Sequence, residues 1–122
     1  MTDQVFVNGL ALHAYHGVMQ HEGKVGQTFK LDLELDIDLA QASRSDKLAD
    51  TVGYDQVVDV TSKAFCAKRY RLVEAAAGAV AEALLDQFRQ VKAVRVTVHK
   101  PHAPIAATFD DVGVSILRRR HG

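Results

Sequence analysis

The clearest pattern of apolar and polar positions in the chain runs over residues 29–39. Apolar side chains hold the odd positions and charged side chains hold the even ones, so that Phe29, Leu31, Leu33, Leu35, Ile37 and Leu39 alternate with Lys30, Asp32, Glu34, Asp36 and Asp38. A period of two is typical of a strand with one face in the core and one face in water. The pattern therefore predicts a long strand in a sheet that has a solvated face.

Weaker patterns predict the remaining elements. Alternating apolar residues indicate three more strands, at Val5–Leu12, Val94–His99 and Val112–Leu117. Gly9 suggests a β-bulge in the first of these. Apolar residues at helical spacing indicate two helices, at about Asp55–Lys68 and Val73–Phe88. The expected order is β-β-α-α-β-β, which predicts an α+β fold: a four-stranded antiparallel sheet with two helices on one face.

The edges of such a sheet carry unpaired backbone groups, which makes them sites of association. The 29–39 strand would span about 36 Å at ~3.3 Å per residue, which is long for an unprotected edge. Its polar face also has no helix to cover it. We therefore expect several copies of the chain to join their sheets edge to edge and close into a ring or barrel.

Composition limits the class of protein. A chain of 122 residues with 48% apolar residues predicts a single domain over residues 1–122 with a core of its own. Lys and Arg number 15, as do Asp and Glu, and this balance argues against a large surface for nucleic acid or anionic membrane. The one dense basic run is Arg118–Arg120, which we expect to be a solvated tail.

Cysteine usage and hydropathy bear on the compartment. Cys66 is the single cysteine, so no internal disulfide can form, and we expect it as a buried, inert thiol on a helix. The first residues lack the apolar core of a signal peptide, and the run "AAAGAVA" stops at Glu82, short of a membrane span. The sequence therefore predicts a cytoplasmic protein without a membrane segment.

Lys100 is the first candidate for chemistry. It ends a predicted strand and precedes Pro101, which restricts the lysine backbone to extended conformations. Pro104 stiffens the segment that follows. A lysine with a fixed backbone suits a reaction in which its amine must meet one defined atom, although a solvated surface lysine would give the same pattern.

Three other side chains are candidates, each with an ordinary structural explanation beside the functional one. Glu74 opens the second helix, where a carboxylate complements the helix dipole or accepts two parallel N–H bonds from a planar ligand edge. Tyr54 precedes the first helix and could pack there or present its hydroxyl to a ligand. Glu22 lies in a glycine-bearing segment and is either a solvated acid or a ligand contact.

The histidines do not predict a metal centre. His13, His16 and His21 fall at spacings that put them on no common helix face, and zinc needs convergent ligands with support behind them. The sequence also lacks a glycine-rich phosphate loop and a nucleophile elbow. We therefore expect neither a metal nor another cofactor.

Taken together, four segments resemble the dihydroneopterin aldolase family of the folate pathway: "HGVMQHEGKVGQTF", "DTVGYDQV", "LVEAAAGAVA" and "HKPHAPI". The resemblance covers about positions 4–119, and the Lys-Pro-x-Ala-Pro-Ile segment at 100–105 is its most specific part. It implies the tunnelling fold, in rings of four subunits that often stack into octamers, with active sites between subunits. It also implies retro-aldol cleavage of 7,8-dihydroneopterin, without metal and without a lysine imine.

The resemblance also implies roles for individual residues. Lys100 would relay protons, Tyr54 of a neighbouring subunit would assist it, and Glu22 would bind the trihydroxypropyl side chain of the substrate. Glu74 and the Val73 backbone would hold the amino-pyrimidinone edge of the pterin. The same proton transfers could invert C2′, which would add an epimerase activity.

Two alternatives stay open at this point. One is a zinc-dependent pterin enzyme of the same fold, which the single cysteine and the histidine spacing disfavour. The other is a non-catalytic pterin-binding ring protein. Such a protein would need Glu74 and a stacking surface but would have no use for Lys100, Tyr54 and Glu22 as a set.

Overall fold

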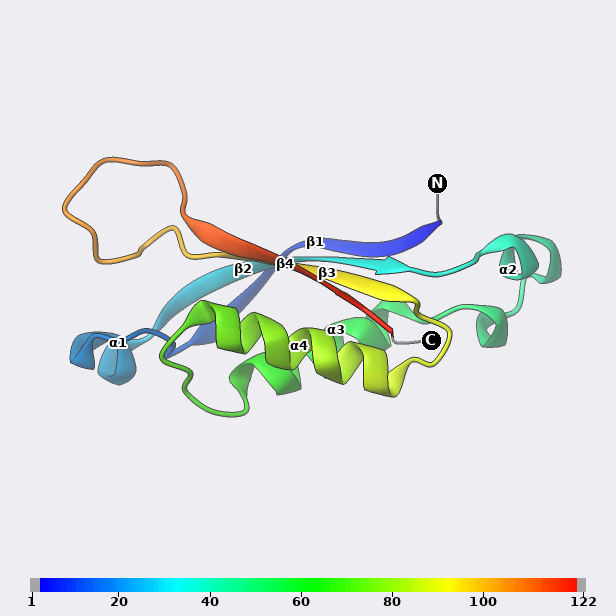
Figure 1. Ribbon diagram of the computed structural model, residues 1–122, viewed down its shortest axis with the longest axis horizontal. Coiled ribbons are helices and arrows are strands. Elements are labelled where there is room, and N and C mark those ends of the chain that lie inside the picture. The colour runs from blue at the N-terminus through cyan, green and yellow to red at the C-terminus, as the bar shows by residue number, and fades with distance from the viewer. Residues whose placement is uncertain (1–2, 121–122) are drawn as a thin grey trace.

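The computed structural model describes residues 3–120. Residues 1–2 and 121–122 of the expected domain lie outside the described residues. Its elements are β1 (Gln4–Ala14), α1 (Gln20–Val25), β2 (Gln27–Asp36), α2 (Ala40–Ser45), the 3-10 helix η1 (Leu48–Asp50), α3 (Tyr54–Cys66), α4 (Val73–Gln87), β3 (Ala93–His99) and β4 (Gly113–Arg119). The four strands form one sheet, and α3 and α4 cover one of its faces (Figure 1). The predicted α+β class is confirmed.

The strand order in the sheet is β1-β2-β3-β4, and every neighbouring pair is antiparallel. The expected bulge is present, since the β1–β2 register shifts between Val7 and Leu10, and Gly9 has a φ of 69°. This left-handed backbone is one that glycine adopts at little cost.

The strand predicted over residues 29–39 differs from expectation in two respects. β2 ends at Asp36, because the backbone N–H of Ile37 instead bonds to the carbonyl of Asp3. β2 also lies between β1 and β3, so the expectation that it forms an edge was wrong. The edges of the sheet among residues 3–120 are β1 and β4, and any joining of sheets between copies must use them.

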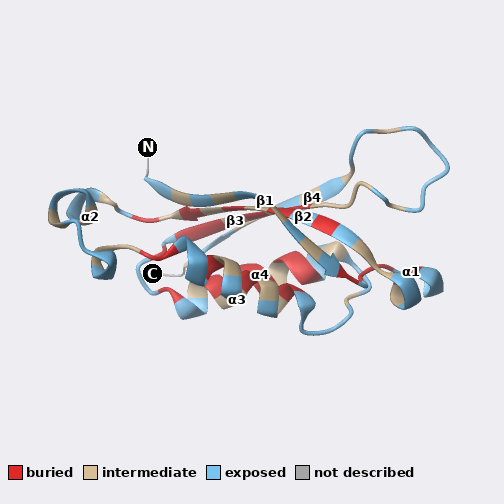
Figure 2. Cartoon of the chain, turned by 180° about the vertical axis from the view of Figure 1, so that it is seen from behind, coloured by how far each residue is buried: buried red, intermediate tan, exposed pale blue. Residues whose placement is uncertain are grey.

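The core lies between the sheet and the two helices (Figure 2). The inward face of β2 and β3 contributes fully buried side chains, namely Leu31, Leu33, Leu35, Val94, Val96 and Val98. Opposite them, α4 buries small residues along with larger ones: Ala76, Ala77, Val80, Ala81 and Leu84. The alanines let the helix approach the sheet closely, so the alanine-rich sequence of α4 reflects packing.

Two expectations about surface residues were wrong. Cys66 is exposed, because it is the last residue of α3, beyond the buried stripe of that helix. Arg118 and Arg119 belong to β4, so the arginine run is not a tail. The guanidinium of Arg120 donates to the backbone carbonyls of Leu85, Phe88 and Val91.

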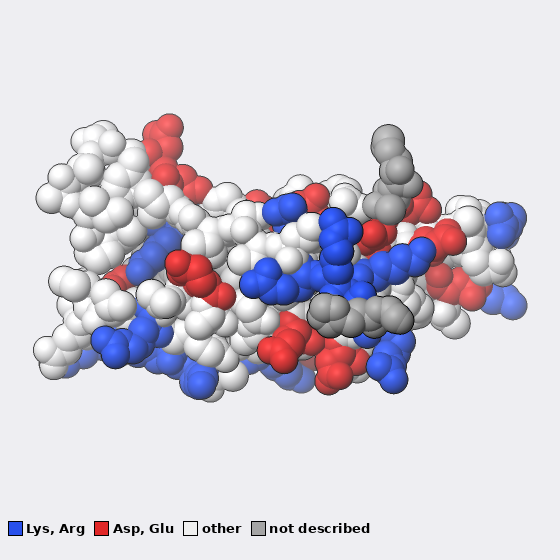
Figure 3. Space-filling view, in the orientation of Figure 1, with Lys and Arg blue, Asp and Glu red and all other residues white. Residues whose placement is uncertain are grey.

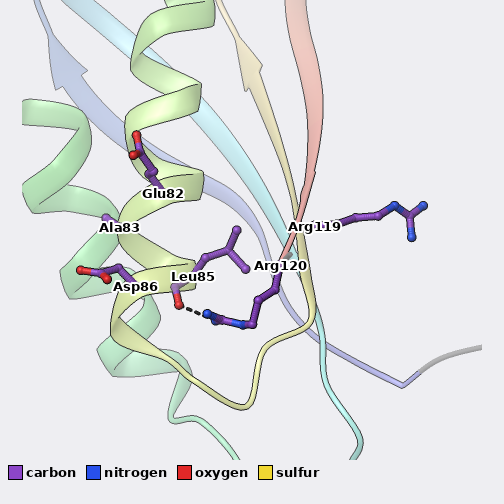
Figure 4. A pocket seen from close by; sticks show the side chains of 6 residues that line it. All are labelled: Glu82, Ala83, Leu85, Asp86, Arg119 and Arg120. Atoms are coloured by element: carbon purple, nitrogen blue, oxygen red, sulfur yellow. Dashed lines mark hydrogen bonds between the residues drawn. The ribbon is translucent and has the colours of Figure 1, made fainter. Parts of the chain in front are cut away.

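These contacts give Arg120 a structural role. The last carbonyls of a helix have no partners within the helix, and a guanidinium with five N–H donors can satisfy several at once. Figure 4 shows Arg120 turned toward the end of α4 and Arg119 turned away. Both belong to a surface hollow of about 570 Å³, lined by Glu82, Ala83, Leu85, Asp86, Arg119 and Arg120.

Charges of both signs are interspersed over the face that carries α4 and β4 (Figure 3). Basic side chains gather in a band across the middle of this face, and acidic ones lie around the band, in line with the balanced composition. Within residues 3–120, no helix combines the length and apolar character needed to cross a membrane.

Candidate active site

The segment expected as a glycine-bearing loop contains a short helix, α1, which carries Glu22 into the interior. The Glu22 side chain is only 3% exposed, and its Oε2 lies 2.6 Å from the Nζ of Lys100. The backbone N–H of Met19 donates to Glu22 Oε1 at 3.1 Å, and Gln27 Nε2 approaches Oε2 at 3.4 Å. Two candidates from distant parts of the sequence thus form a largely buried ion pair.

The local sequence explains why the Glu22 carboxylate can turn inward. Gly17 has a φ of 141°, and a Cβ built there would lie 2.2 Å from Glu22 Oε1, so a side chain at this position would displace the carboxylate. The Arg69 guanidinium fixes the same segment by donating to the carbonyls of Gly17 and Met19, each at 2.8 Å. Arg69 was missed at the sequence level, because a lysine- and arginine-bearing loop gives no signal of what it contacts.

The charge state of Glu22 follows from competing effects. Burial acts to raise the pKa of this carboxyl, but the hydrogen bonds from Lys100 and the Met19 amide outweigh it and lower the pKa overall. Glu22 is therefore ionised at neutral pH despite its burial. The pair presents a carboxylate and an ammonium group side by side.

His16 has a structural role next to this pair. Its ring is 1% exposed, its Nε2 lies 2.8 Å from the Phe65 carbonyl, and its Nδ1 accepts the N–H of Tyr70 at 3.0 Å. Burial, the largest effect, lowers the pKa of His16, so the ring is neutral, with its proton on Nε2. Both nitrogens are engaged, which leaves His16 no lone pair for a metal and argues against a ligand set built from His13, His16 and His21.

Lys100 stands where the sequence predicted, directly after the end of β3 at His99. Its backbone N–H donates to the Val112 carbonyl at 2.7 Å, which closes the neck of the connection between β3 and β4. The side chain is 14% exposed, so the ammonium group is neither free in solvent nor sealed off.

Val73 and Glu74 form the first turn of α4, and Glu74 is exposed there. The preceding loop is tied to the Glu22 region, since the N–H of Gly17 donates to the Tyr70 carbonyl at 3.0 Å. In Figure 1 the start of α4 lies at the same end of the molecule as α1. Four of the five candidate residues therefore come from one end of the fold.

Tyr54 is the exception. It starts α3 and is 71% exposed, at the end where α4 finishes, as the bond from Gln90 Nε2 to the Thr51 carbonyl shows. α4 has 15 residues, so its two ends are about 22 Å apart at 1.5 Å per residue. Within one copy of the chain, Tyr54 does not meet Lys100.

This arrangement can be set beside known proteins. The family model for dihydroneopterin aldolase matches residues 5–117. The dihydroneopterin aldolase of Methylorubrum extorquens is 39% identical over 120 residues, which cover 98% of this chain and 92% of that protein. The chain belongs to the dihydroneopterin aldolase family. The resemblance noted in the sequence is confirmed, and the family takes its name from a lyase activity.

Solved structures of the family agree. E. coli dihydroneopterin aldolase, in complex with neopterin, is 34% identical with a TM-score of 0.86, over 95% of this chain and 98% of that one. A dihydroneopterin aldolase from Burkholderia, bound to guanine, is 26% identical with a TM-score of 0.80, over 98% of this chain and 93% of that one. The fold expected from the resemblance is therefore confirmed.

Proposed function

We propose that this chain catalyses the retro-aldol cleavage of 7,8-dihydroneopterin into 6-hydroxymethyl-7,8-dihydropterin and glycolaldehyde, a step of folate biosynthesis. The observation that carries the proposal is the contact between Lys100 and the buried carboxylate of Glu22, in a chain of the dihydroneopterin aldolase family. The complex of the E. coli relative with neopterin supports a pterin substrate.

The chemistry needs proton transfer more than it needs a cofactor. Removal of the proton from the 2′-hydroxyl lets the C1′–C2′ bond break and glycolaldehyde leave. The bonding electrons pass into the C=N bond of the dihydropterin ring next to the side chain. A proton delivered to C1′ then gives the hydroxymethyl product. The ring itself holds the electrons, so the reaction requires neither a lysine imine nor a metal.

Lys100 is proposed as the proton relay, acting through water as base and then as acid. Its side chain keeps 14% of its surface exposed, against 3% for Glu22, which supports Lys100 as the member of the pair that meets a ligand. Glu22 is proposed to bind the trihydroxypropyl chain and to keep a negative charge beside the lysine. Proton transfer by a positioned side chain contributes about 10²- to 10⁴-fold in rate.

Glu74 and the Val73 backbone are proposed to bind the amino-pyrimidinone edge of the pterin. A carboxylate matches two parallel N–H groups, and the first turn of α4 offers backbone N–H groups without helical partners. The guanine bound to the Burkholderia relative carries a similar amino-pyrimidinone edge, which supports this assignment. The edge contact would set the distance from the substrate side chain to Lys100.

Tyr54 is proposed to reach the site from a neighbouring copy, as part of a ring of four or of two stacked rings. Its separation from Lys100 within one chain supports a site formed between copies, as do the two sheet edges β1 and β4. Exposed apolar side chains also cluster by sequence around α1 and the start of α4, at Val18, Met19, Val25 and Leu72. A cytoplasmic location and inversion at C2′ as a second reaction complete the proposal.

The test is product analysis with 7,8-dihydroneopterin, with and without EDTA. We expect glycolaldehyde and 6-hydroxymethyl-7,8-dihydropterin in both conditions, and no adduct at Lys100 after borohydride. Loss of turnover in EDTA would favour a zinc enzyme, and tight neopterin binding without turnover would favour a binding protein.

A further inference from the structure

His99, next to Lys100 in sequence, lies between two carboxylates. Its Nε2 is 2.7 Å from Asp32 Oδ2, and its Nδ1 is 2.5 Å from Asp111 Oδ2. Asp32 belongs to the central strand β2, whereas Asp111 lies in the connection just before β4. We call Asp32, His99 and Asp111 the His99 clasp. No step of the proposed reaction uses it.

Counting protons shows that the clasp carries charge. A neutral imidazole has one N–H donor and one acceptor nitrogen, and an ionised carboxylate can only accept. Both ring nitrogens face carboxylate oxygens, so both bonds form only with an imidazolium ring or a protonated carboxyl. Asp32 Oδ1 also accepts the N–H of Gly9 at 2.8 Å, which favours the ionised carboxylate and hence the imidazolium.

The pKa directions agree with this count. The hydrogen bonds that the His99 ring makes to Asp32 and then to Asp111 raise the pKa of His99, against an opposing effect of burial. Burial acts to raise the pKa of Asp32, but its bonds with His99 and the Gly9 amide lower it overall. The other charged side chain that faces His99 in the sheet register is Lys30, its direct partner on β2.

The clasp holds the neck of the connection that Lys100 begins. His99 pairs with Gly113 in the β3–β4 register, and the next residue, Lys100, bonds through its N–H to the Val112 carbonyl at 2.7 Å. A Cβ on Gly113 would lie 2.1 Å from the Val98 carbonyl oxygen, so the two strands approach very closely here. The contact between the His99 and Asp111 side chains thus spans the same neck as the backbone bond of Lys100.

We propose that His99 is a positioning residue for Lys100: the charged clasp fixes the neck of the 100–112 connection and thereby keeps the lysine amine at Glu22. This inference rests on the proposed function and adds a pH range over which Lys100 is held in place. Because the pKa of His99 is raised, the contribution of the ring is complete below its ordinary value near 6.5 and is lost as pH rises through the higher folded value. The contribution of Asp32 is lost only as pH falls below about 3.8.

The first test compares His99→Gln with the control Thr97→Val. Thr97 lies on the same strand and face, and its Oγ1 is 2.9 Å from Ser115 Oγ, so the control also removes a link between β3 and β4. We expect His99→Gln to lower kcat about tenfold with less change in KM, because small misplacements of a reacting group cost up to about 100-fold. Thr97→Val should keep the wild-type kcat.

The pH profile separates positioning by a charged ring from simple support of the fold. Asp111→Asn keeps the shape of the side chain but removes one carboxylate, so it also serves if His99→Gln fails to fold. In the wild type, kcat should fall as rising pH removes the charge of the His99 ring. We expect this fall to occur at lower pH in Asp111→Asn and to be absent in His99→Gln, which has no titrating ring. A purely structural role would lower kcat equally at every pH and would overturn the proposal.

Two readouts do not need turnover. The ring nitrogens of His99, followed by ¹⁵N NMR, should titrate above pH 6.5 in the wild type and at lower pH in Asp111→Asn. A crystal structure of His99→Gln should show Lys100 displaced from Glu22. If the wild type fails to cleave dihydroneopterin, the proposed function is wrong, while these two measurements still judge the clasp. An unchanged Lys100–Glu22 contact in His99→Gln would refute it.

Discussion

The two ends of the α3–α4 layer are built very differently. At one end, Glu22 and Lys100 form a largely buried ion pair beside the first turn of α4. At the other end, Tyr54 stands on the surface at the start of α3, where Arg120 caps the end of α4. At the first end, the fold buries most of the Glu22 and Lys100 side chains. At the second end, the Tyr54 side chain is mostly exposed.

This difference supports the proposal that the second half of the site comes from another copy of the chain. A phenol that is 71% exposed contributes little to the stability of its own chain, so its exposure fits a contact with another copy. Among residues 3–120, no hydroxyl group hydrogen-bonds to the buried pair at the opposite end. The proposed assembly brings the two ends together, and the following experiments test that comparison.

The largest expected effect is on Lys100. Lys100→Ala should lower kcat about 10³-fold, because it removes the proposed proton relay. Lys24→Ala is the matched control, since Lys24 lies on α1 near Glu22 but is exposed. Steady-state kinetics on dihydroneopterin provides the measurement, and similar rates for both variants would remove Lys100 from the mechanism.

Tyr54→Phe should lower kcat about 100-fold with little change in melting temperature, because the lost hydroxyl lies on the surface. A second experiment dissociates Tyr54→Phe and Lys100→Ala assemblies, mixes the subunits in equal amounts and lets them reassemble. If each site takes Lys100 from one chain and Tyr54 from its neighbour, random mixing should leave roughly a quarter of the sites with both residues intact. No recovery in confirmed mixed rings would mean that Tyr54 and Lys100 act within one chain.

Glu74→Gln should weaken substrate binding and raise KM by about 10-fold or more, because a hydrogen bond to a charged group contributes about 1.5–3 kcal/mol. Glu82→Gln, an exposed change on the same helix, is the control. Isothermal titration with neopterin checks the expectation. Equal affinities for the two variants would contradict the role given to Glu74.

The smallest expected effect is on stability and concerns Arg120, at the end of the molecule where α4 finishes. Arg120→Ala should destabilise the fold by about 1–3 kcal/mol, because three buried or half-buried carbonyls lose a donor. Arg119→Ala should change the free energy of unfolding by less than about 0.5 kcal/mol, since its side chain points to solvent. Urea denaturation measures both, and equal values would refute the capping role.

Local patterns in the sequence predicted the elements well where packing follows the period. The alternation predicted over residues 29–39 reappears as the buried face of β2 up to Leu35, and the helical spacing predicted over Val73–Phe88 reappears as the buried face of α4. Gly9 was correctly predicted as a bulge, because only a local backbone requirement was involved. The strand order was not predictable from local patterns, since none of them indicates that β2 pairs with both β1 and β3.

The site followed a similar division. Pro101 made Lys100 a candidate, the family motif added Glu22, Tyr54, Val73 and Glu74, and the roles of all five stay predictions. The sequence could not show that Glu22 is buried, because its inward turn depends on Gly17, Arg69 and Met19 acting at a distance along the chain. The partners of His99 and Arg120 were invisible for the same reason.

The most direct measurement is a crystal structure of the assembled protein with neopterin. The account predicts the pterin ring against Glu74, the trihydroxypropyl chain between Lys100 and Glu22, and the hydroxyl of Tyr54 arriving from a second copy. Neopterin bound away from Glu74, or a site completed without a second chain, would contradict it.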